Sequence, residues 1–297
     1  MFQKIIGHHR IKTQLQRDLE TRQLHHAYLF SGPEHVGKMA LCREMVSLVK
    51  TGKAFEEGSS LASQLEAGEG QGLIAFYDDG ETLKVEQVRK ISTFVSRRTA
   101  ADQHSFCIIE NIERMTHSAA NSFLKNLEEP PDRLIYLLTS RAERKLLATI
   151  LSRVSLFRFN TVPTADIRQC LEAAAHNPLL VDEVMKLSAG RIGLALSMLK
   201  NEEVLDRMRE LYDFAALIFD KDLIDRFALV DHLTAKEVSR ADLNQFLSFL
   251  ALQLQKEGSH RFVPQLDRLQ ELKKLFTDTQ VNKRLFLEEF MLSLTCG

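Results

Sequence analysis

The stretch with the clearest chemical potential is residues 32–38, where two glycines and a lysine stand at the G-x-x-x-x-G-K spacing. Glycines let a loop turn tightly so that backbone N–H groups face one point, and the N-terminus of a following helix adds positive potential there. A lysine at the end of such a loop reaches the terminal phosphates of a nucleotide. The spacing therefore predicts a phosphate-binding loop, with an accidental Gly-Lys turn as the alternative. We assign to this loop Gly32, Pro33, His35, Val36, Gly37 and Lys38.

Two positions that a working nucleotide site needs hold the wrong residue types. Met39 stands where a Ser or Thr hydroxyl would ligate Mg²⁺, and a thioether is a poor ligand for a hard cation. Glu110 and Asn111 end an apolar run, where a phosphate-loop ATPase carries one acid that holds Mg²⁺ and another that polarises the attacking water. Glu110 keeps a carboxylate, but the amide of Asn111 is no base near neutral pH. We predict degenerate Walker motifs that leave a relic or weak nucleotide site.

The elements that must position these residues follow from the hydrophobic pattern. Short apolar runs alternate with amphipathic helical stretches up to about residue 159, which predicts a parallel sheet with helices on both faces. The runs are residues 27–30, 73–77, 106–109, 134–138 and 155–159. The phosphate loop then lies between the first strand and a helix at 39–49, and a helix at 117–129 ends at Pro130.

Strand signals stop after residue 159, and the rest of the chain has helical periodicity only. Three short helices are expected at 164–175, 178–189 and 191–200, and longer ones at 242–256 and 282–295. We therefore expect an α/β domain at 1–160, a small helical domain at 161–203 and an all-helical domain at 204–297.

Composition excludes several classes of protein. The 39 basic and 40 acidic residues leave a net charge of -1, so any contact with DNA is expected to be local or shared with partners. The 4 cysteines are scattered without a Cys-x-x-Cys pair, so we expect no zinc site and no disulfide framework. The N-terminus has no apolar signal region, and no apolar run approaches the roughly 20 residues of a membrane span. We expect a cytoplasmic protein with no membrane partner.

Residues 115–131 read MTHSAANSFLKNLEEPP, the most distinctive segment of the chain. This segment is similar to the aaNaLLKtLEEPp segment of the clamp-loader subunits of bacterial DNA polymerase III, a family of AAA+ proteins. Residues 6–8 and 26–38 resemble the family's opening, residues 149–153 its TI-SR motif, and residues 282–285 with the following helix its C-terminal end.

The resemblance implies a RecA-like AAA+ domain with a parallel sheet, a small helical lid and an all-helical collar domain that closes a hetero-pentameric ring. Met39 and Asn111 point to the delta-prime type of subunit, because the ATP-hydrolysing gamma/tau subunits are expected to keep Lys-Thr and Asp-Glu. The implied partners are gamma/tau and delta, and through the complex the sliding clamp and primed DNA. ATP would be bound by the partner subunits, and this chain would require no cofactor.

The sequence departs from the family pattern in two places. Many relatives carry a four-cysteine zinc module after the first helix of the sheet domain, but residues 51–72 hold five glycines and no cysteine. We expect no zinc there, and a surface excursion with one short helix instead. The motif that usually reads Ser-Arg-Cys has Val154 after Arg153, which leaves the arginine in place.

By resemblance, Arg153 is an arginine finger offered in trans to ATP on a neighbouring subunit. A guanidinium is always charged and presents a planar fork to phosphate oxygens. The alternative is a surface arginine that caps a helix. Residues 141–158 hold five basic side chains against the single acid Glu143, an excess that faces either phosphates or solvent.

Two further residues are candidate nucleotide sensors. Thr139 ends the fourth predicted strand, where it would sense a γ-phosphate or simply bond the backbone. Arg191 opens the third short helix, between Gly190 and Gly193, so a second sensor and a tight turn are both plausible there.

The function we predict is that of a non-catalytic clamp-loader subunit. Two alternatives come from other classes. An active AAA+ motor of a clamp or helicase loader would have to tolerate Met39 and Asn111. A small-molecule kinase would need a substrate lid within the α/β domain, whereas the additional mass here is helical and C-terminal.

Overall fold

The computed structural model describes residues 1–96, 104–175, 177–234, 238–256, 265–269, 271 and 282–294. The chain forms two compact units, Met1–Leu196 and Ser197–Gly297. The division into three domains stays a prediction.

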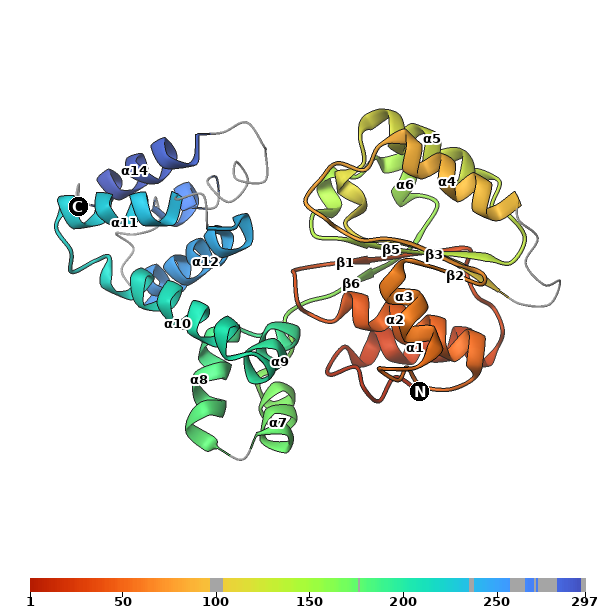
Figure 1. The fold of residues 1–297 in the computed structure, drawn as a ribbon, viewed down its shortest axis with the longest axis horizontal. Helices are drawn as coiled ribbons and strands as arrows, with labels where there is room; N and C mark the ends of the chain where they lie inside the picture. Colours follow the sequence, from red (N-terminus) through yellow and green to blue (C-terminus); the bar gives the residue numbers. More distant parts are fainter. Residues whose placement is uncertain are drawn as a thin grey trace. The chain divides into compact units, whose positions relative to one another are not determined.

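A six-stranded sheet in the order β2-β3-β4-β5-β1-β6 forms the centre of the first unit (Figure 1). Its strands are β1 (Ala27–Ser31), β2 (Glu69–Gly70), β3 (Leu73–Phe76), β4 (Ser105–Ile109), β5 (Leu134–Ser140) and β6 (Ser155–Arg158). Neighbouring strands are parallel except β2 and β3, which are antiparallel. The predicted parallel sheet is confirmed, and each of its apolar runs is a strand whose ends differ by one or two residues.

Helices cover both faces of the sheet (Figure 1). One face carries α1 (His9–Glu20), α2 (Lys38–Thr51) and α3 (Ser60–Ala67); the other carries α4 (Val85–Ser96), α5 (His117–Glu128) and α6 (Ala148–Leu151). Within β1, Tyr28 and Phe30 pack into the first layer, while Ala27 and Leu29 pack into the second. Because both faces are covered, the central strands are buried throughout, which explains their continuous apolar runs.

The expected surface excursion at residues 51–72 is partly wrong. It contains the predicted short helix, α3, but this helix buries Leu61 and Leu65 in the core beside α2. It also contains β2, whose two residues are too few to give an alternating pattern.

Three short helices follow the sheet, α7 (Thr164–Ala174), α8 (Pro178–Ser188) and α9 (Ile192–Lys200), close to the predicted ranges. The Asn177 side chain caps α8 by accepting a hydrogen bond from the backbone N–H of Leu179. Two 3₁₀ helices, η1 (Ile112–Arg114) and η2 (Glu143–Lys145), lie in the loops after β4 and β5.

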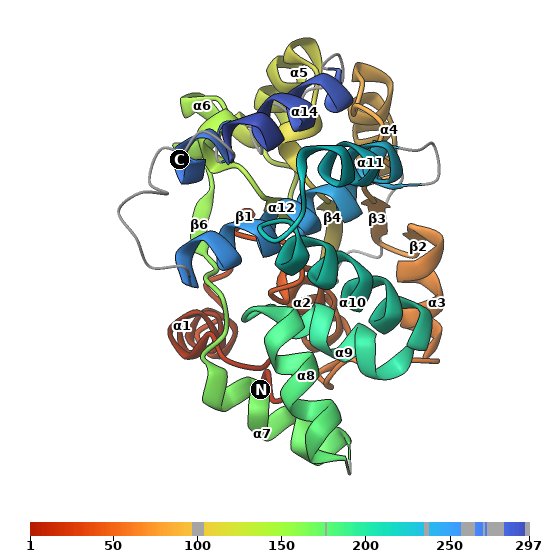
Figure 2. The ribbon, with the colours of Figure 1, turned by 90° about the vertical axis from the view of Figure 1, so that its left-hand side faces the viewer.

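The second unit is helical in the part that the structure describes (Figure 2). Its helices are α10 (Glu202–Leu217), α11 (Leu223–Thr234), α12 (Arg240–Lys256) and α14 (Lys283–Ser293), with α10 against α12 and α11 against α14. The predicted end of the last helix at residue 295 lies outside the described residues. Apolar residues of α12 such as Phe246 and Phe249 are buried. No helix among the described residues is long and apolar enough to span a membrane.

Candidate functional site

The phosphate loop has the predicted context, with β1 before it and α2 after it. Gly32 has a φ of 151°, and a Cβ at this position would lie 2.2 Å from the carbonyl oxygen of Phe159. Gly37 precedes the first turn of α2 with a φ of 106°. Side chains are therefore excluded sterically at Gly32 and disfavoured conformationally at Gly37, which explains both glycines of the motif.

Lys38 is turned back onto the loop. Its side chain is buried, and its Nζ donates to the carbonyl oxygen of Gly32 at 2.6 Å and to that of Pro33. Burial, and next the positive charge of Arg141, lower the pKa of Lys38 to about 8. The charge that would meet a nucleotide phosphate is thus held by the loop's own carbonyl groups.

Two segments distant in sequence hold the middle of the loop. The Nε2 atom of His8 lies 2.9 Å from the carbonyl oxygen of Val36, and the backbone N–H of Gly193 donates to the carbonyl oxygen of His35 at 2.7 Å. A Cβ at Gly193 would lie 2.9 Å from that oxygen, so only glycine lets α9 approach this closely. Burial lowers the pKa of both histidines. The short helices and the loop are therefore joined through backbone groups that sequence reasoning missed.

Beside the loop lies a group of charged and polar side chains that we call the Asp78 cluster. Its members are Asp78, Asn111, Arg114, Arg141 and Glu34. The carboxylate of Asp78 accepts from the Asn111 side chain and pairs with both arginines, each contact measuring 2.7 Å. Arg141 also pairs with Glu34 in the phosphate loop. The end of β3, the segment after β4, the end of β5 and the loop are joined in this way.

Glu110 and Asn111, the two residues of the predicted degenerate Walker B motif, both form a hydrogen bond with Asp78. Asn111 is buried with a φ of 52° and donates its side-chain amide to Asp78. Glu110 accepts from the backbone N–H of Asp78 at 3.2 Å. The Thr139 hydroxyl is fully buried and accepts from the backbone N–H of Asn111 at 3.0 Å. Thr139 thus makes the kind of backbone bond that we weighed against a sensor role, and the sensor role stays a prediction.

The second candidate sensor, Arg191, lies just before α9. Its Nε donates to the carbonyl oxygen of Ser188 at 3.0 Å, and burial lowers its pKa, while the charge of Glu34 acts to raise it. This hydrogen bond thus ties Arg191 to the end of α8, and the sensor role of Arg191 stays a prediction.

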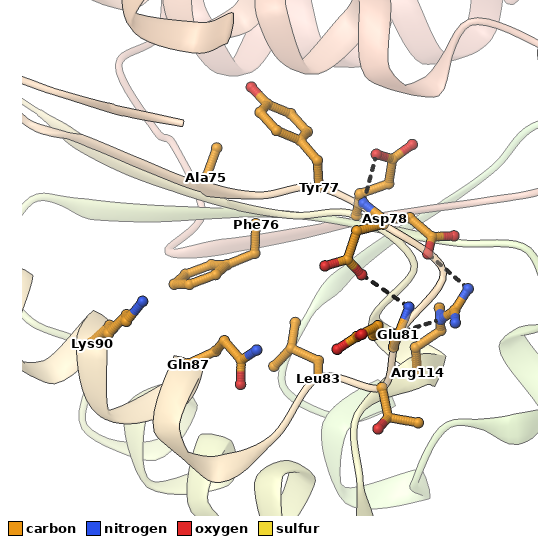
Figure 3. A pocket seen from close by; sticks show the side chains of 12 residues that line it. Ala75, Phe76, Tyr77, Asp78, Glu81, Leu83, Gln87, Lys90 and Arg114 are labelled. Carbon is orange, nitrogen blue, oxygen red and sulfur yellow. Dashed lines mark hydrogen bonds and ion pairs between the residues drawn. The ribbon is translucent and has the colours of Figure 1, made fainter. Parts of the chain in front are cut away.

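A pocket of about 280 Å³ opens beside the Asp78 cluster, at the carboxyl ends of β3 and β4. Figure 3 shows Gln87 and Lys90 of α4 on one side of it and Asp78 with Arg114 on another. Glu110 lines it as well. Among the described residues, no group of three or more His, Cys, Asp or Glu side chains is arranged to hold a metal ion.

Arg153 lies away from all of these residues. It precedes β6, which runs parallel to β1 with Tyr28 opposite Ser155 and Ser31 opposite Arg158. Because parallel strands share their direction, Arg153 is at the amino edge of the sheet and the phosphate loop at the carboxyl edge. The structure thus separates the predicted finger from the predicted nucleotide loop.

The guanidinium of Arg153 is half-buried and has three contacts. Its Nη2 pairs with Glu128 at 2.8 Å, and its Nη1 donates to the Thr149 carbonyl at 2.9 Å and to the Ser152 hydroxyl at 3.1 Å. Within the basic segment at residues 141–158, Arg158 also pairs with an acid, Glu143, at 2.6 Å. Part of the apparent basic excess is therefore neutralised by carboxylates of the same chain.

A parallel sheet covered by helices on both faces, with a phosphate loop between its first strand and the next helix, defines an α/β domain of the RecA-like AAA+ class. The family model described as "DNA polymerase III, delta subunit" matches residues 7–163. That is more than half of the chain, so the protein belongs to this family, and the predicted resemblance is confirmed.

Relatives with assigned names agree with the family. The tau subunit of DNA polymerase III from Escherichia coli K12 is 29% identical over 211 residues, which are 66% of this chain and 32% of tau. The delta' subunit from Bacillus subtilis 168 is 26% identical over 197 residues, which are 65% of this chain and 60% of that subunit. The chain therefore spans less than two thirds of these relatives.

A solved structure shares the fold over nearly the whole length. The DNA polymerase III gamma subunit-related protein from Thermotoga maritima is 20% identical and superimposes with a TM-score of 0.57, covering 95% of this chain and 97% of its own.

Proposed function

We propose that this protein is a non-catalytic, delta-prime-type subunit of the DNA polymerase III clamp loader. In this proposal it joins gamma/tau and delta in a hetero-pentameric ring that loads the sliding clamp onto primed DNA. ATP is bound by the partners, and this chain supplies Arg153 in trans. Family membership and relatives that carry the delta' name support the assignment.

The observation that carries the proposal is the position of Arg153 relative to the chain's own phosphate loop. The paired stretch from Tyr28–Ser155 to Ser31–Arg158 alone spans about 10 Å, at roughly 3.3 Å per residue. Arg153 lies before this stretch and the loop lies after it, and the guanidinium is turned to Glu128 at the end of α5. Such an arginine is out of reach of its own loop and accessible to a phosphate on another chain.

The composition of the loop supports a non-catalytic role. Met39 packs against the hydrophobic core between the sheet and α2, so its sulfur belongs to the core and not to a metal site. Asn111 cannot take a proton from water, and its amide is committed to Asp78. In this proposal the loop survives as a structural element.

The first test is ATP turnover by the isolated protein with Mg²⁺, in a preparation shown to be free of contaminating ATPases. We expect no turnover above background. A rate near 1 per second, the low end of ordinary enzymes, would favour the alternative of an active AAA+ motor.

The second test uses the ring reconstituted with gamma/tau and delta. Arg153→Ala should leave the mass of the complex unchanged and lower its ATP turnover in the presence of clamp and primed DNA. Loss of an arginine finger costs roughly 10³–10⁵ in well-studied GTPases, which is an upper guide because the other ATP sites of the ring keep their fingers. Arg153→Lys should restore little, because an ammonium lacks the planar fork. Equal rates for wild type and both variants would contradict the role in trans.

A further inference from the structure

Glu128 is placed where a carboxylate does not help its own helix. It is the last residue of α5, and the C-terminal end of a helix carries a partial negative charge that disfavours acids. The adjacent cap residue, Glu129, adds a second acid at the same end. Helix stability therefore does not explain a glutamate here, whereas a contact of its side chain does.

That contact is the ion pair with Arg153. The Oε1 atom of Glu128 lies 2.8 Å from Nη2 of Arg153, while Nη1 bonds the Thr149 carbonyl and the Ser152 hydroxyl. The guanidinium is thus held from one side by a carboxylate and from the other by the end of α6. Roughly a third of the arginine side chain and half of the glutamate stay exposed, so the pair lies at the surface that a partner would approach.

We propose that Glu128 is a positioning residue for Arg153. It holds the guanidinium in one orientation before the neighbouring ATP arrives. A long arginine side chain samples many rotamers, and the conformational entropy that it loses on binding weakens any contact it makes. An arginine that is already ordered binds phosphate with a smaller loss of entropy. The inference rests on the proposed function, since it requires that Arg153 act on a partner's nucleotide.

The experiment is steady-state ATP turnover of the reconstituted complex, with clamp and primed DNA, for Glu128→Gln. This variant keeps the size of the side chain and removes its charge. Because an exposed ion pair is weak, the expected effect is modest, a loss of about 2- to 5-fold at the shared site. Glu129→Gln is the matched control, since it removes an acid from the same helix end and should leave turnover unchanged.

The double variant Glu128→Gln/Arg153→Ala separates positioning from a general effect on α5. If Glu128 acts through Arg153, adding Glu128→Gln to Arg153→Ala changes nothing further, because the group to be positioned is already gone. A further loss in the double variant, or equal or higher turnover for Glu128→Gln alone, overturns the inference. If Arg153→Ala itself has no effect, the finger in trans fails, and that failure is distinguishable from the failure of Glu128 alone.

Discussion

Replacing Asp78 by Asn should destabilise the first unit strongly, because this change removes the carboxylate at the centre of the Asp78 cluster. The side chain of Asp78 is only 7% exposed, and it pairs with Arg114 and Arg141, whose side chains are 27% and 40% exposed. A hydrogen bond to a charged group contributes roughly 1.5–3 kcal/mol. Solvent screens the more exposed Arg141, which reduces its share. We therefore expect a loss of about 3 kcal/mol in the free energy of unfolding.

The assay is urea unfolding of the full chain followed by tyrosine fluorescence. The protein has 4 tyrosines and no tryptophan, and Tyr28, Tyr77 and Tyr136 lie in the first unit, so the signal reports mainly on that unit. In thermal unfolding the same change should lower the Tm by roughly 6–12 °C, since about 1 kcal/mol shifts a unit of this size by about 2–4 °C. Asp79→Asn is the control: this exposed neighbour bonds only the backbone N–H of Glu81 among the described contacts, and should change stability by less than about 0.5 kcal/mol.

A loss below about 1 kcal/mol for Asp78→Asn would refute the reasoning, because surface ion pairs have that magnitude. It would mean that the two arginines find solvent or other acids at little cost. A large and equal loss for Asp78→Asn and Asp79→Asn would instead locate the effect in the loop after β3 and not in the cluster.

Three further predictions concern single residues or segments. The amine of Lys38 should titrate near pH 8, as measured by NMR of ¹³C-labelled lysine. Folding lowers this pKa from 10.5, so the protonated amine opposes folding. The free energy of unfolding of the wild type, relative to that of Lys38→Met, should therefore rise as the pH increases from 8 to 10.5. Elemental analysis should find no stoichiometric zinc, and one zinc per chain would contradict the expectation drawn from residues 51–72. A chain ending at Lys200 should stay folded, as judged by circular dichroism, and fail to join the partner subunits. The truncation removes the exposed apolar side chains of Ile224 and Leu285, which are 79% and 59% exposed. Co-purification equal to that of the full chain would exclude a collar role.

The central strands β1, β4 and β5 could be predicted from the sequence because each is buried on both faces and therefore reads as a continuous apolar run. The phosphate loop could be predicted because a steric limit at Gly32 and a positive φ at Gly37 both favour glycine, which makes the motif visible in the sequence. Strand β2 could not be predicted, because two residues are too few to show the alternating hydrophobic pattern of a strand. Core burial of α3 was missed because glycines around it signal turns more strongly than Leu61 and Leu65 signal packing.

The Asp78 cluster could not be predicted, since its members come from four separate segments, and the motifs that contain Glu34 and Asn111 do not point to Asp78. Asp78 looks like one of several acids in the run from Asp78 to Glu81, and only the tertiary fold selects it over Asp79. Arg141 was counted as part of a basic excess for the same reason. Pairing across strand ends depends on which strands are neighbours, and residue spacing along the chain does not contain that information.

The two edges of the sheet hold their cations in different ways. At the carboxyl edge, Lys38 is satisfied by loop carbonyls, and Arg141 by Glu34 and Asp78. Both cations are therefore paired with groups of the same chain. At the amino edge, Arg153 keeps a partly exposed guanidinium whose contacts are all at the surface. Burial distinguishes only part of the first edge: Asp78 and Lys38 are buried there, whereas Arg141 and Glu34 are about as exposed as Arg153 and Glu128, so the contacts of Asp78 and Lys38 are the costly ones to break.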